Sequence, residues 1–281
     1  MTTSAPDIVV TVLGSSGGYP AYGLPCSGYL VEAAGQRLLL DCGSGVTGAL
    51  LAESDRCGLD AIIISHMHPD HILDLMPLGY ALLTEWISGG RTTPLPLYLP
   101  TGGKEFLQRF SDLFGHRHWR MSDAKSDGHR AIAAALERGE DWFTTVFDMR
   151  EYEPGEGWNE GAFTIATMRV DHSVPTAAMR IGTGGRELVY SGDTRFMPAL
   201  ADFASDAELF LVDAHLSGPK APGGAHMTPA DAGILAQKAG VCTLVLCHLG
   251  GPEDADSALS AAAQSFKGNI HVALRDKVYT I

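Results

Sequence analysis

The sequence is short of positive charge and of long apolar runs. Its 281 residues carry 33 acidic side chains against 20 Lys and Arg, a formal net charge of −13. A large nucleic-acid footprint needs basic side chains that neutralise phosphates, so this balance argues against one. No apolar run approaches the roughly 18 residues of a membrane span, and the N-terminus lacks the basic and apolar regions of a signal peptide. We therefore expect a soluble cytoplasmic protein without a membrane partner.

Cysteine is also scarce, with five residues in no CxxC spacing. An odd number at such spacings indicates neither a disulfide framework nor a structural zinc ribbon, which fits a reduced cytoplasm. The glycine turn at residues 14–18 is not GxGxxG, and no helical segment follows it. These two absences exclude a disulfide-stabilised fold and a dinucleotide site.

A dense cluster of metal-ligand residue types follows the apolar run at residues 61–64. His66, His68, Asp70 and His71 fall within six positions, and the β-branched run before them predicts a buried strand. Imidazole and carboxylate are ligands that zinc and related metals prefer. Because the four side chains form two closely spaced pairs, the loop could serve two neighbouring ions, and we predict a dinuclear metal site.

The second half repeats this pattern, because four apolar segments that read as strands end in an acid or a histidine. The residues at these ends are His172, Asp193, Asp213 and His248. Alternating strands and helices favour α/β layering. No change in composition marks a domain boundary, so we expect one domain over residues 1–281.

Several elements are predicted from local patterns. Residues 28–32 and 37–41 read as a hairpin, 72–86 and 229–239 as helices, the second behind Thr228 as N-cap, and 143–147 as a strand. Basic residues gather between positions 115 and 140. A solvated loop is the simpler interpretation, and a cover that binds an anionic substrate group is the alternative.

Together these motifs resemble the metallo-β-lactamase fold hydrolases. His66-x-His68-x-Asp70-His71 matches the family signature, while His172, the Gly192-Asp193 pair and His248 match the remaining ligand positions in order. The resemblance covers nearly the whole chain. It implies an α/β (α+β) fold, an αββα sandwich in which two similar halves each contribute ligands at strand ends.

The resemblance also implies how the ligands divide between two divalent ions, with zinc as the expected metal and manganese or iron as alternatives. One ion would be held by His66, His68 and His172, the other by Asp70, His71 and His248, with Asp193 between them. Asp41 would orient a ligand histidine. Because relatives form dimers, a homodimer is expected.

Within this superfamily, His226-Met227-Thr228 and Asp213-Ala214 resemble the phosphodiesterase and ribonuclease Z branch. His226, paired with Asp213, would protonate the leaving alkoxide, and Asp70 would orient the attacking hydroxide. Here the acidic segment has a shorter acid than the family motif and lacks its histidine, which argues against RNA cleavage. His215, which follows, receives no role.

The leading hypothesis is a phosphodiesterase that acts on a small anionic substrate such as a cyclic nucleotide. A tRNA 3′-processing endonuclease is the first alternative, although the sequence offers no Gly/Pro-rich basic arm to hold tRNA. Hydrolysis of a thioester, lactone or sulfate ester is the second, because pocket walls decide among electrophiles. A metal-free binding module is the non-enzyme alternative, and the intact set of seven ligands argues against it.

Overall fold

Two seven-stranded sheets form the centre of the computed structural model, which describes residues 7–52, 57–113, 130, 134, 142–215, 224–250 and 255–281. The first sheet runs in the order β14 (Val278–Thr280), β1 (Val9–Gly14), β2 (Gly28–Ala33), β3 (Gln36–Leu40), β4 (Ala61–Ile63), β5 (Leu95–Pro100) and β6 (Phe147–Tyr152). The second runs in the order β13 (Asn269–Val272), β12 (Thr243–Cys247), β11 (Leu209–Asp213), β10 (Arg186–Tyr190), β9 (Thr176–Thr183), β8 (Phe163–Val170) and β7 (Gly157–Glu160).

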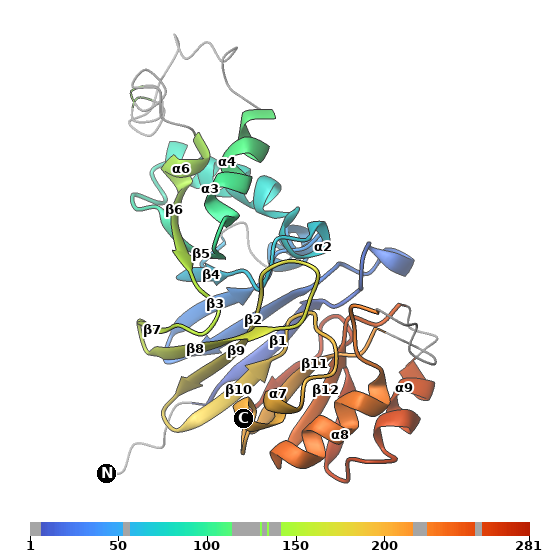
Figure 1. Cartoon of the computed structure of the whole chain (residues 1–281). Coiled ribbons are helices and arrows are strands. Elements are labelled where there is room, and N and C mark those ends of the chain that lie inside the picture. Colours follow the sequence, from blue (N-terminus) through green and yellow to red (C-terminus); the bar gives the residue numbers. More distant parts are fainter. Residues whose placement is uncertain are drawn as a thin grey trace, which may run out of the picture.

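Helices cover the outer face of each sheet (Figure 1). The first sheet carries α1 (Val46–Leu50), α3 (Leu75–Ile87), α4 (Gly103–Leu113) and α6 (Trp142–Val146), with α2 (Pro69–Ile72) at one end. The second carries α7 (Pro198–Phe203), α8 (Pro229–Ala239) and α9 (Ala255–Ala262), and a 3₁₀ turn, η1 (Ala21–Gly23), follows β1. The predicted αββα sandwich is therefore confirmed. In the described residues, no helix is long and apolar enough to span a membrane.

Strand alternation explains the three apolar layers. On β3, Leu38 and Leu40 enter the core between the sheets, while Leu39 packs under the helices of the first sheet. On β11, Leu211 faces the inter-sheet core and Phe210 faces the helices of the second sheet. Both strands are thus buried on two faces, as expected for inner strands of a layered α/β fold.

Two predicted elements differ from the structure. The helix predicted over 72–86 is divided into α2 and α3, because Asp74 between them is tied to the chain beside α1. Its carboxylate accepts the Thr47 N–H at 2.8 Å, and its own N–H donates to Cys42 O at 3.0 Å. The strand predicted over 143–147 is wrong: Trp142–Val146 is the helix α6, and the strand begins at Phe147.

The helical form of α6 has a packing reason. Trp142, Phe143 and Val146 all enter the core beneath α3, and a single helical turn places these positions on one side. The hairpin predicted over 28–32 and 37–41 is confirmed as β2 and β3. Most of the basic cluster predicted between 115 and 140 lies outside the described residues.

Parallel pairing brings the chemically important strand ends to one edge of each sheet. β3 pairs parallel with β4, and β10, β11 and β12 pair parallel in sequence. Asp41 and His66 therefore follow neighbouring strands of the first sheet. Asp193, Asp213 and His248 lie at neighbouring ends in the second.

Candidate metal centre

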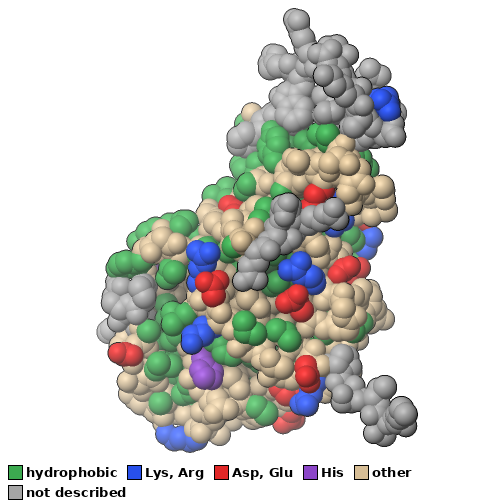
Figure 2. Space-filling view, turned by 180° about the vertical axis from the view of Figure 1, so that it is seen from behind, with side chains coloured by type: hydrophobic (Ala, Val, Ile, Leu, Met, Phe, Trp, Pro, Cys, Tyr) green, Lys and Arg blue, Asp and Glu red, His purple; other side chains and the backbone are tan. Residues whose placement is uncertain are grey.

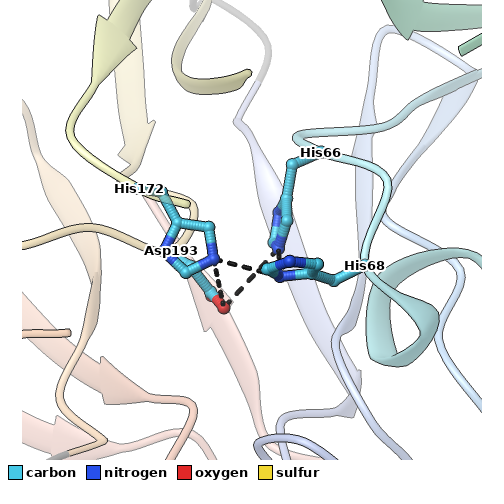
Figure 3. Close-up of side chains that lie close together, drawn as sticks. All are labelled: His66, His68, His172 and Asp193. Carbon is cyan, nitrogen blue, oxygen red and sulfur yellow. Dashed lines mark hydrogen bonds and ion pairs between the residues drawn. The ribbon is translucent and has the colours of Figure 1, made fainter. Parts of the chain in front are cut away.

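One group of side chains joins the loop after β4 to two loops of the second sheet (Figure 3). His68 Nδ1 lies 3.0 Å from Nε2 of both His66 and His172. Asp193 Oδ2 lies 3.6 Å from His66 Nε2 and 4.0 Å from His172 Nε2. The four side chains point toward one another from opposite sides, and their ligand atoms lie within 4.8 Å.

A second group shares Asp193 and lies deeper. His248 Nε2 is 3.0 Å from Asp70 Oδ2 and 3.2 Å from Asp193 Oδ2. His71 Nε2 is 3.4 Å from Asp193 Oδ1 and 3.6 Å from Asp70 Oδ2. All four residues are buried. The seven residues predicted as metal ligands thus lie together as two groups of four with Asp193 common to both, while their metal binding itself stays a prediction.

In three of these histidines, a hydrogen bond at Nδ1, the ring nitrogen that faces away from the two groups, fixes the tautomer. Nδ1 of His71 donates to Asp41 Oδ2 at 2.7 Å, and Nδ1 of His172 donates to Ala225 O at 3.1 Å. Nδ1 of His66 donates to Ser65 Oγ at 3.0 Å, because that hydroxyl already donates to Asp41. In the neutral ring each Nε2 therefore carries the lone pair, directed into the groups, which is the arrangement typical of metal-ligating histidine.

Electrostatics support the same protonation states in the first group. Burial lowers the pKa of His68 and His172, and burial together with His71 lowers the pKa of His66. Burial alone would raise the pKa of Asp193, but the neighbouring His248 and His71 hold it well below its usual range. Neutral imidazoles thus face an ionised carboxylate.

In the second group, the carboxylates and the histidines together shift one another's pKa values more strongly than burial does. Burial would raise the pKa of Asp70, but the hydrogen bond from His248 and the nearby His71 lower it. Burial would lower the pKa of His71 and His248, but Asp193, assisted by Asp41 at His71 and by Asp70 at His248, raises both. This site thus holds negative charge and favours a cation.

The donor set fits divalent transition metals. His71 Nε2 is fully buried and has no hydrogen-bond partner in the described part of the chain, yet it faces two carboxylates. Two ionised carboxylates around this nitrogen are costly in a buried site unless a cation, either a proton on His71 or a metal ion, lies among them. Nitrogen and oxygen donors of this kind suit zinc, and also manganese or iron.

The predicted pair of His226 and Asp213 is also brought together. His226 Nδ1 lies 2.9 Å from Asp213 Oδ2 and 3.9 Å from Asp193 Oδ2. The carboxylate of Asp213 also accepts the Thr194 N–H at 3.0 Å. The His226 side chain is 19% exposed, so it lies at the edge of the second group where a substrate could reach it.

Some contributors were missed from the sequence. The backbone N–H of Gly18 donates to Asp70 Oδ2 at 2.7 Å, and Tyr190 donates to Asp41 Oδ2 at 2.8 Å. The glycine turn at 14–18 was visible in the sequence, but only as an argument against a dinucleotide site. Tyr190 ends a strand one residue before Ser191, and nothing in its local pattern separates it from a core tyrosine.

The chain is similar in sequence and fold to known proteins. The sequence-family model for the β-lactamase superfamily domain matches residues 36–249. The probable metallo-hydrolase YhfI of Bacillus subtilis (strain 168) is 30% identical over 265 residues, covering 94% of this chain and 96% of the relative. Its crystal structure, described as a metallo-β-lactamase fold protein, has a TM-score of 0.82 at 28% identity and covers 98% of this chain and 100% of that one.

Two further matches carry names from phosphoester chemistry. A ribonuclease Z of Mycobacterium bovis (strain BCG / Pasteur 1173P2) is 30% identical over 281 residues, covering 94% of each chain. A diphosphatase from the PhnP family has a TM-score of 0.67, covers 98% of this chain and 97% of that one, and shares the fold at 17% identity. The chain therefore belongs to the β-lactamase superfamily and is one of its metallo-hydrolases.

Proposed function

We propose that the protein is a phosphodiesterase that uses two divalent metal ions, zinc in the first instance, to hydrolyse a small anionic phosphodiester such as a cyclic nucleotide. The observation that carries the proposal is the His226–Asp213 pair at 2.9 Å beside two ligand groups that share Asp193. A thioester hydrolase releases a thiolate, a better leaving group than an alkoxide, and so has less need of a proton donor at this edge. The 30% identity to a ribonuclease Z also supports the phosphoester branch.

The proposed ligands are His66, His68 and His172 for one ion, Asp70, His71 and His248 for the other, and Asp193 for both. Two bound cations would lower the pKa of a bound water and neutralise charge that develops on phosphoryl oxygens. The Gly18 N–H donates to Asp70 Oδ2 at 2.7 Å, so this carboxylate has a fixed direction in which to orient the attacking water.

His226 supplies the proton for the leaving oxygen in this proposal. Its Nδ1 donates to Asp213, which leaves Nε2 as the ring atom that can hand a proton to the departing alkoxide. Asp213 is fixed in turn by the N–H groups of Thr194 and His215, both at 3.0 Å. The carboxylate therefore holds the ring in one orientation.

A small substrate is preferred over tRNA because of charge. The chain is acidic overall, at −13. On the face seen in Figure 2, the coloured Lys and Arg side chains are interspersed with Asp and Glu and form no extended basic patch. Cleavage of precursor tRNA stays the second candidate, because the ribonuclease Z relative matches 94% of the chain.

A hydrolysis panel tests the proposal. It contains bis(p-nitrophenyl) phosphate, cyclic AMP, a precursor tRNA and a thioester, each with and without a chelator. We expect chelator-sensitive turnover of the small diesters, and a loss of about 100-fold or more in His226→Ala. His271→Ala is the matched control, because His271 is an exposed histidine of β13 that lies in none of the ligand groups.

Two outcomes would contradict the proposal. Faster cleavage of precursor tRNA than of the small diesters would reverse the ranking of substrates. Unchanged diester turnover in His226→Ala would remove the role of that residue.

A further inference from the structure

His215 is a histidine of the centre that neither ligand group uses. It follows β11 by two residues, and its ring lies 4.7 Å from the ring of His226 and 5.1 Å from that of His248, measured between centroids. Its Nδ1 lies 3.0 Å from the carbonyl oxygen of His248. A carbonyl only accepts, so the Nδ1 atom carries the proton and donates it in this hydrogen bond.

His248 lacks the hydrogen bond at Nδ1 that orients the rings of three other proposed ligand histidines. Nδ1 of His66, His71 and His172 each has a hydrogen-bond partner. Nδ1 of His248 is buried and has none among the described residues, because Asp213 Oδ1 is 3.8 Å away, beyond hydrogen-bond distance. Its ring orientation is therefore not set by a direct acceptor in the usual way.

The backbone of His248 is also in an unfavourable conformation. Its φ is +60°, in the left-handed region that a residue with a side chain rarely adopts. This conformation turns the chain after β12 and leaves the His248 side chain directed at Asp70 and Asp193. A donor on its carbonyl oxygen satisfies a buried polar group there and stabilises that conformation.

The loop after β1 encloses the same hydrogen bond. Gly17 donates its N–H to Leu249 O at 3.3 Å, the residue after His248. A Cβ at Gly17 would lie 2.7 Å from His215 Nδ1 and 2.8 Å from both Nδ1 and O of His248. The His215 ring is thus held between this loop and His248, and a larger residue at position 17 would push them apart.

We infer that His215 is a positioning residue for the metal centre: through its Nδ1–H it holds the carbonyl of His248, and so fixes the direction of the His248 ring toward Asp70 and Asp193. This inference rests on the metal centre of the proposed function. It assigns a role to His215, which follows the Asp213-Ala214 segment and has none in the proposed reaction.

Metal affinity in a matched set of variants tests the inference. His215→Phe keeps the ring area and removes the donor, while His215→Asn keeps an amide N–H near the position of Nδ1. Each protein is stripped with a chelator, and its zinc affinity and zinc content are measured by chelator competition. We expect His215→Phe to lower the affinity for one of the two zinc ions by about tenfold or more and His215→Asn to restore most of that loss.

A second variant reaches the same hydrogen bond without changing His215. Gly17→Ala should weaken zinc binding as His215→Phe does, whereas Gly48→Ala, where an added Cβ meets nothing within 4 Å, should not. Circular dichroism checks that each variant is folded. Normal affinity in His215→Phe or Gly17→Ala, or equal losses in His215→Asn and His215→Phe, would overturn the inference. Because no substrate enters the measurement, a failed hydrolysis panel would leave this result intact.

Discussion

Asp41 collects four hydrogen bonds on one buried carboxylate. Its donors are the N–H and Oγ–H of Ser65, Nδ1 of His71 and the hydroxyl of Tyr190, all at 2.6 to 2.8 Å. The residue adopts φ +59°, a strained conformation for a non-glycine. Its contacts reach a proposed ligand, the start of the ligand loop and a strand of the opposite sheet, so one side chain links three parts of the site by hydrogen bonds.

Asp41→Asn tests this arrangement. The amide has only one accepting oxygen, and its NH₂ would meet groups that are themselves donors, so His71 would lose its orientation. We expect zinc affinity to fall about 10- to 100-fold, as measured by chelator competition. Asp148→Asn, at an exposed carboxylate of β6, is the control. Unchanged affinity in Asp41→Asn would show that His71 does not depend on this carboxylate.

At the scale of elements, the loop between β1 and β2 offers aromatic surface beside the centre. Tyr19 is 67% exposed and Tyr22 is 68% exposed. The loop is anchored by the hydrogen bond from Gly18 to Asp70 and by Ser16 Oγ, which donates to Tyr19 O at 2.9 Å. Tyr19 directly follows Gly18, which contacts the proposed ligand Asp70, so its exposed ring is suited to stacking on a nucleobase.

Under the proposed function, Tyr19→Ala should raise KM for cyclic AMP about fivefold with little change in kcat, since base stacking on an aromatic side chain contributes about 1–3 kcal/mol. Steady-state kinetics of the two variants Tyr19→Ala and Tyr19→Phe measure it, and Phe should retain KM because it keeps the ring. Equal KM in wild type and Tyr19→Ala would argue that the base lies elsewhere.

The helix α8 begins three residues after His226, and a capping box closes its N-terminus. Thr228 Oγ1 accepts the Asp231 N–H at 3.1 Å, while Asp231 Oδ2 accepts the Thr228 N–H at 3.1 Å. Thr228→Ala should lower the free energy of unfolding by about 1 kcal/mol, read from urea denaturation. Thr228→Ser keeps the hydroxyl and should lose less. A larger loss in the serine variant would contradict this role of the hydroxyl.

The sequence predicts the strands that deliver the site residues, because each apolar run leads into a His or an Asp. It does not predict β9, whose first half, Thr176, Ala177, Ala178 and Met179, lacks a β-branched pattern after the threonine. That strand is set by its pairing with β8 and β10. The same limit applies to His215, because its hydrogen bond to His248 joins positions 33 residues apart.

For the whole molecule, the burial of thiols and a phenol makes the free energy of unfolding depend on pH in the alkaline range. Burial, with Asp70, raises the pKa of Cys26 to about 12, and burial, with Glu85, raises that of Cys57 to about 12. Burial likewise raises the pKa of Tyr279 to about 12. In the unfolded chain thiols ionise near 8.5 and tyrosine near 10, so the unfolded state loses these protons first as pH rises.

The free energy of unfolding should therefore fall as pH rises above about 9, and keep falling toward the folded pKa values. Urea midpoints between pH 7 and pH 10.5 measure this slope. Cys57→Ala should flatten it, whatever its effect on stability at pH 7, because one ionisable group is gone. A slope identical to wild type would show that Cys57 does not contribute.

The proposed ligands are spread from His66 to His248, and this order along the chain has a consequence for biosynthesis. A nascent chain exposes the His66–His71 loop long before residues 172, 193 and 248 have left the ribosome. Each ligand group includes at least one residue from the second half, so neither is complete at that stage. Metal capture is thus expected only after the strands that carry these second-half residues have been synthesised and have folded against the first sheet.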